Sequence, residues 1–118
     1  MNTPLIETDR LILRRFTEDD LEAIYAIYSD EEVNTFLPWF PLKTMEEARL
    51  LYEQQYARQY RLTGGCRWAV CLKPVRIPIG YIHVSADDSH DLGYGLRKEY
   101  WRRGIITEAG EAVIRQLR

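Results

Sequence analysis

The residues with the clearest chemical potential lie near the end of the chain, in a basic turn that precedes a predicted helix. Gly104 stands directly before the residues that we expect to open this helix. A helix start presents N–H groups without intrahelical partners and the positive end of the helix dipole, and glycine lets a ligand approach the backbone. Four basic side chains surround this point: Arg97, Lys98, Arg102 and Arg103. The pattern predicts a site for a phosphorylated ligand; a plain solvated turn is the alternative.

Metal and thiol chemistry are not expected. Cys66 and Cys71 are five residues apart in one predicted strand, which points them to opposite faces, roughly 16 Å apart, too far for a disulfide. His83 and His90 do not complete a zinc site with them. The sequence therefore predicts free thiols in a reducing compartment and no metal cofactor.

The elements that position the basic turn can be predicted from periodicity and capping residues. Residues 10–15 are rich in strand formers, and the patterns at residues 17–20 and 44–47 are capping boxes that open two helices, the second running to about Arg61. Three strands are then expected at residues 67–72, 78–84 and 90–96, followed by a helix from Gly104. The predicted order is β-α-α-β-β-β-α, an α/β (mixed α+β) fold.

Length and composition indicate a single small domain covering residues 1–118. The 118 residues are 46% hydrophobic and 29% charged, as in soluble globular proteins, and the net charge of −2 argues against nucleic-acid binding. No apolar run is long enough for a membrane span and no signal peptide is recognisable, so a cytoplasmic location is expected. The first half is acidic and the second basic, which fits an anionic ligand in the second half or merely uneven solvated faces.

A strand, a basic turn, Arg102-Arg103-Gly104 and a helix containing Thr107-Glu108-Ala109 resemble the acetyl-coenzyme A (acetyl-CoA) motif of the GNAT N-acetyltransferases. Residues 7–14 and 17–20 are similar to the first strand and helix of the Rim-type branch, whose members acetylate protein N-termini. Residues 80–81 and 92–94 also look like the central strands of that branch. The resemblance covers nearly the whole chain. It implies a mixed, mostly antiparallel sheet flanked by helices, with acetyl-CoA as cosubstrate.

The resemblance also implies which residues bind the cosubstrate. Backbone groups of Tyr94, Gly95 and Leu96 would pair with the pantetheine arm. Backbone amides from six successive residues would hold the diphosphate: Arg102, Arg103, Gly104, Ile105, Ile106 and Thr107. Ile106 departs from the family, which has glycine or alanine there; its branched side chain would either turn outward or weaken binding.

Catalysis in the family is direct attack of an amine on the thioester, which needs a base for the ammonium group. His90 and Asp91 occupy the neighbourhood of the usual base, either as catalysts or as turn and surface residues. The expected function is transfer of an acetyl group to a primary amine, of a protein N-terminus or a small molecule. The alternative is a catalytically incomplete coenzyme A-binding or protein-interaction module.

Two aromatic features have competing interpretations. Tyr52, Tyr56 and Tyr60 recur every four residues of a predicted helix, which favours packing over ligand binding. Residues 36–40 carry three aromatic rings in a loop where the family lines its acceptor cleft, so they either contact substrate or serve structure.

The resemblance implies a domain truncated after the cofactor-loop helix, because family members continue with a further strand. That strand would lie beside residues 90–96, whose exposed edge then favours a homodimer formed by strand pairing. No nucleic-acid or membrane partner is expected.

Overall fold

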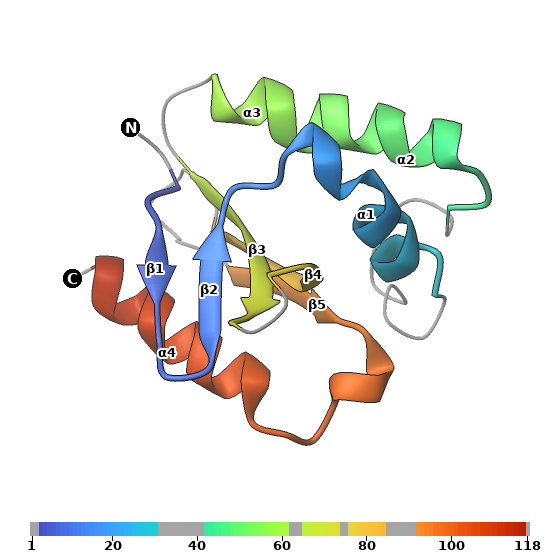
Figure 1. Cartoon of the computed structure of the whole chain (residues 1–118). Coiled ribbons are helices and arrows are strands. Elements are labelled where there is room, and N and C mark those ends of the chain that lie inside the picture. Colours follow the sequence, from blue (N-terminus) through green and yellow to red (C-terminus); the bar gives the residue numbers. More distant parts are fainter. Residues whose placement is uncertain (1–2, 31–41, 62–64, 74–75, 85–91, 118) are drawn as a thin grey trace.

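A five-stranded antiparallel sheet organises the fold in the computed structural model, which describes residues 3–30, 42–61, 65–73, 76–84 and 92–117 (Figure 1). Each strand pairs antiparallel with its neighbours, and the spatial order follows the chain. The strands are β1 (Ile6–Glu7), β2 (Leu11–Arg14), β3 (Cys66–Leu72), β4 (Pro78–Val84) and β5 (Leu92–Leu96). The predicted mixed α/β fold with a mostly antiparallel sheet is confirmed.

The strand limits differ from the predictions mainly at the beginning of the chain. β1 was not predicted, because two residues carry no periodicity; it forms by pairing with β2. The predicted strand at residues 10–15 is shorter by one residue at each end, and β3 begins one residue earlier than predicted. β4 has the predicted limits. Within the predicted strand at 90–96, β5 covers Leu92–Leu96, and residues 90 and 91 lie outside the described residues.

Both predicted capping boxes open helical segments. At the first, the Thr17 backbone N–H donates to the Asp20 carboxylate at 2.7 Å, and a 3-10 helix (Glu18–Asp20) leads into α1 (Leu21–Tyr28). At the second, the Glu47 backbone N–H donates to the Thr44 hydroxyl at 3.1 Å. The second helical run comprises α2 (Met45–Tyr52), a π-helical segment (Glu53–Ala57) and α3 (Arg58–Tyr60), close to the predicted limits.

The helices cover both faces of the sheet and create two cores. α4 (Ile105–Leu117) packs on one face of the sheet (Figure 1). Trp68, Val70 and Ile82 are buried beneath it. α1, α2 and the π-helical segment pack on the other face, around residues such as Tyr28 and Tyr56. Cys66 packs against the first core and Cys71 lies in the second, and both are free, as the alternation of strand side chains predicts.

The layered arrangement places β5 at one edge of the sheet, with β4 as its sole strand neighbour among the described residues. The expected exposed strand edge before the basic turn is therefore present in the structure. None of the described helices is long and apolar enough to cross a membrane.

Candidate functional site

Glycines occupy both sides of a contact between β4 and β5 that has no room for added side chains. A Cβ atom on Gly95 would lie 2.5 Å from a ring carbon of Tyr81 and 2.7 Å from its hydroxyl oxygen. A Cβ atom on Gly80 would lie 2.4 Å from the Gly95 carbonyl oxygen. Real Cβ contacts are essentially never this short, so both positions require glycine. The Tyr81 ring thus lies against the edge strand itself.

The register of β4 and β5 determines which backbone groups face outward. The Arg97 N–H donates to the Ile79 carbonyl at 2.9 Å, and residues 81 and 95 are partners two positions further along. Antiparallel pairs alternate between hydrogen-bonded and non-hydrogen-bonded. Gly95 therefore bonds toward β4, whereas the N–H and C=O groups of Tyr94 and Leu96 point to the outer edge.

One of these outward groups already has a partner. The Trp101 indole N–H donates to the Leu96 carbonyl at 2.6 Å. This contact folds the basic turn back against the end of β5. The Leu96 N–H and both backbone groups of Tyr94 remain directed at the edge where the pantetheine arm is expected to bind.

The basic turn leads into α4 through two residues with left-handed backbone. Arg102 has a φ of 65° and Gly104 a φ of 73°, and the whole segment from Trp101 to Gly104 is exposed. The Glu108 N–H donates to the Gly104 carbonyl at 3.0 Å, forming the first bond of the helix. The N–H groups of the three residues between them therefore lie at the open helix start. This confirms the predicted helix start beside Gly104.

Ile106 packs partly buried against the core beneath α4. The side chain therefore does not turn outward, which was the first of the two alternatives. The second alternative, weaker binding of the cosubstrate, stays a prediction.

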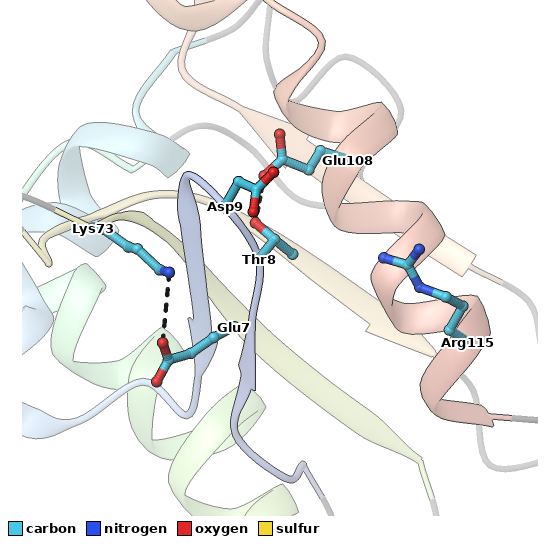
Figure 2. Close-up of a pocket in the computed structure, with 6 residues that line it drawn as sticks. All are labelled: Glu7, Thr8, Asp9, Lys73, Glu108 and Arg115. Carbon is cyan, nitrogen blue, oxygen red and sulfur yellow. Dashed lines mark hydrogen bonds and ion pairs between the residues drawn. The ribbon is translucent and has the colours of Figure 1, made fainter.

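The start of α4 is tied to the turn between β1 and β2, a link that was not predicted from the sequence. Thr8 donates a hydrogen bond from its hydroxyl to the Glu108 carboxylate (Figure 2). The Arg10 side chain forms an ion pair with the same carboxylate at 2.7 Å. Arg10 also donates to the Arg103 carbonyl at 3.0 Å. The available signal was an acidic residue in the first turn of a helix, which predicts a partner but not its identity.

A shallow surface depression adjoins this link, on the side of the sheet edge formed by β1. Figure 2 shows its lining, which includes an ion pair of Lys73 with Glu7 at 3.6 Å and the Arg115 side chain from α4. It lies away from the outer edge of β5, and its acidic and basic groups largely neutralise one another. No group of three metal-ligating side chains occurs in the described ranges.

The Glu108 carboxylate predicts a pH dependence of stability. Burial raises its pKa, but the hydrogen bonds from Thr8 and Arg10 outweigh this and lower it below the ordinary value. A lowered pKa means that the stabilisation is present above the unfolded pKa, near 4, and is lost as the pH falls through the folded value. We expect Glu108→Gln to reduce the free energy of unfolding by about 1 kcal/mol at pH 7. The difference should decrease in urea titrations as the pH falls through the lowered pKa of Glu108; a difference independent of pH would contradict the assignment.

An aromatic cluster covers the other face of β4 and β5. The hydroxyl groups of Tyr28 and Tyr56 are hydrogen-bonded, and the Tyr56 hydroxyl also lies 2.9 Å from Nε2 of His83. Tyr28 stacks on Tyr81, with ring centroids 4.9 Å apart. Burial, followed by the positive charge of Arg67, lowers the pKa of His83 to about 3, so this histidine is neutral at physiological pH.

The predicted packing role of the helical tyrosines is confirmed: Tyr56 lies in the second core, and Tyr52 and Tyr60 pack against it. Tyr56 and Tyr60 also have polar links that the sequence did not reveal. Tyr56 is fully buried, and the Tyr60 hydroxyl accepts from the Phe16 N–H and donates to the Arg67 carbonyl. The candidate bases His90 and Asp91, and the aromatic loop at residues 36–40, lie outside the described residues.

Comparison with known proteins identifies the class. Residues 10–118 match the family described as the acetyltransferase (GNAT) domain. The chain therefore belongs to the GNAT family.

Individual relatives agree with this assignment. The uncharacterized N-acetyltransferase YoaA of Bacillus subtilis (strain 168) is 34% identical over 115 residues, which cover 94% of this chain and 64% of the relative. A GNAT acetyltransferase structure from Bacillus anthracis has a TM-score of 0.75 at 23% identity, covering 94% of this chain and 64% of that chain. A Vibrio cholerae structure named as a candidate ribosomal-protein-serine acetyltransferase has a TM-score of 0.77 at 23% identity, with 97% and 67% covered. The chain thus spans just under two thirds of the length of the curated relatives it matches.

Proposed function

We propose that this chain is the cosubstrate-binding part of an acetyl-CoA-dependent N-acetyltransferase that acetylates a primary amine. The proposal rests on three features that could bind the cosubstrate and that follow one another along the chain. The outward backbone groups of Tyr94 and Leu96 lead into an exposed basic turn, and the turn leads to the open start of α4. Family membership supports acetyl transfer as the general activity.

The residues present fit this cosubstrate. Backbone amides between Arg102 and Thr107 would hold the diphosphate, assisted by the two arginine side chains, because a helix start and positive charge both favour an anion. The free groups on β5 would pair with the amides of the pantetheine arm, as an added strand does. When bound, the cosubstrate supplies an activated acetyl thioester.

The chain's own groups would then prepare the acceptor. On this proposal His90 or Asp91, which directly precede β5 in the sequence, takes the proton of the ammonium group, directly or through water. The Rim-type features support a protein N-terminus as acceptor, and a small amine is the second possibility. A homodimer formed through β5 stays a prediction, and it is compatible with this site only if the outward groups of Tyr94 and Leu96 remain available to the cosubstrate.

Calorimetric titration of the purified chain with coenzyme A tests cosubstrate binding independently of the acceptor. We expect coenzyme A to bind much more tightly than pantetheine. Pantetheine lacks the diphosphate, whose negative charge would be bound by the basic residues and backbone amides at the start of α4. Steady-state acetyl transfer to a panel of peptides and small amines is measured on the same sample.

The two outcomes separate the candidate functions. Binding with turnover supports the transferase. Binding without turnover favours the coenzyme A-binding module. Equal affinities for coenzyme A and pantetheine would contradict a diphosphate site.

A further inference from the structure

The Tyr81 hydroxyl is a buried polar group without a hydrogen-bond partner among the described residues. Tyr81 is only 3% exposed, and burial alone raises the pKa of its hydroxyl to about 12. A buried hydroxyl without a partner is unfavourable, by an amount comparable to a lost hydrogen bond. Such a group in a native structure requires an explanation.

The neighbouring polar groups do not share this property. Tyr56 bonds to both Tyr28 and His83, and Tyr60 bonds to two backbone groups. Tyr81 contacts the cluster through its ring, which lies 4.9 Å from the Tyr28 ring and 4.8 Å from the His83 ring. The hydroxyl groups of Tyr28, Tyr56 and Tyr60 thus have hydrogen-bond partners in the cluster, and the hydroxyl of Tyr81 does not.

The position of the hydroxyl connects it to the edge strand. Tyr81 is the register partner of Gly95, and its hydroxyl oxygen occupies space 2.7 Å from where a Gly95 side chain would begin. The ring therefore extends from β4 across β5. The absence of a side chain at Gly95 is what lets the hydroxyl reach the strand whose outer edge carries the free backbone groups of Tyr94.

We propose that the Tyr81 hydroxyl donates a hydrogen bond to a carbonyl oxygen of the acetylated pantetheine arm bound along β5. The inference rests on the proposed function, because it needs that arm at the outer edge of β5. Two kinds of carbonyl group occur on the arm, the amides of pantetheine and the acetyl thioester. Both are hydrogen-bond acceptors, and a hydroxyl that stays protonated at neutral pH is a donor for either.

Tyr81→Phe tests the proposal, because it removes the hydroxyl and keeps the ring. We expect the affinity for acetyl-CoA to fall about 5- to 10-fold in calorimetric titrations, as for the loss of one hydrogen bond. The thermal midpoint of the free protein should stay the same or rise, because the variant no longer buries an unpaired hydroxyl. A weaker ligand site in an equally stable protein is not expected from a merely structural residue.

Coenzyme A and Tyr56→Phe provide the controls. An equal loss of affinity for coenzyme A and acetyl-CoA would assign the bond to a pantetheine amide, and a loss confined to acetyl-CoA would assign it to the thioester; either supports the proposal. Tyr56→Phe removes bonded contacts of the same cluster, so it should lower the midpoint and leave the affinity nearly unchanged.

Three other results would contradict the role proposed for Tyr81. Unchanged affinities in Tyr81→Phe, with normal binding by the wild type, would reject the role of Tyr81 and leave the proposed function intact. A lowered midpoint in Tyr81→Phe would show that the hydroxyl is structural. Binding of neither ligand by the wild type would reject the proposed function, and the Tyr81 assignment with it.

Discussion

Gly80→Ala is expected to lower the free energy of unfolding by about 3 kcal/mol, the upper end of the usual range for overpacking. The added Cβ would lie 2.4 Å from the Gly95 carbonyl oxygen and 3.1 Å from the Leu96 Cα atom. Both are backbone atoms of β5, so they cannot move aside without shifting the strand. For a chain of this length the thermal midpoint should fall by roughly 10 °C, measured by circular dichroism together with urea unfolding.

Gly93→Ala is the matched control on the edge strand. No atom lies within 4 Å of the position of its added Cβ, so the free energy of unfolding should change by less than about 0.5 kcal/mol. The same pair of variants also tests the site. Gly80→Ala should weaken coenzyme A binding because it displaces β5, whereas the effect of Gly93→Ala on binding should be small. Equal stability of the two variants would contradict the close approach of β4 and β5.

Gly104→Asp is expected to reduce the affinity for coenzyme A by roughly 30- to 100-fold. The substitution places a carboxylate at the open start of α4, where the diphosphate is proposed to bind, and repulsion between charges a few ångströms apart amounts to about 2–3 kcal/mol near a protein surface. The side chain itself has room, because its Cβ would meet only the Arg10 guanidinium at 3.6 Å. The loss of affinity should shrink as salt is added, since the charges are exposed.

Gly104→Asn separates charge from shape. Asparagine and aspartate have similar size, and both tolerate the left-handed backbone found at this position, with a φ of 73°. We expect Gly104→Asn to bind coenzyme A within about 3-fold of the wild type, because it lacks the charge. Without ligand, the free energy of unfolding should be similar in the two variants or higher in the Asp variant, because a carboxylate stabilises a helix start. Identical affinities for the Asp and Asn variants would place the anion site elsewhere.

Features that depend on neighbouring residues in the sequence were predicted well. The capping boxes at Thr17 and Thr44 place two helix starts correctly, and the left-handed Gly104 marks the third. β4 has the predicted limits, and the opposite facing of Cys66 and Cys71 follows from strand alternation. Capping and alternation act over a few residues, so the sequence contains the information directly.

Contacts between distant residues were decided by the tertiary structure alone. Glu108 meets Thr8 and Arg10 from about 100 positions away, and Tyr56 meets His83 across 27 positions. Such pairs depend on which helix packs on which face of the sheet, and no local pattern encodes that choice. β1 exists for the same reason, because two residues become a strand only when β2 lies beside them.

The candidate site combines both kinds of information. The sequence by itself determined the strand, the basic turn and the helix start, because their residue types and spacing are local signals. The need for glycine at position 95 and the unpaired hydroxyl of Tyr81 emerge only from the register of β4 against β5. Register is determined by packing across the whole sheet, and a shift of one residue would reverse the face of every side chain in β5.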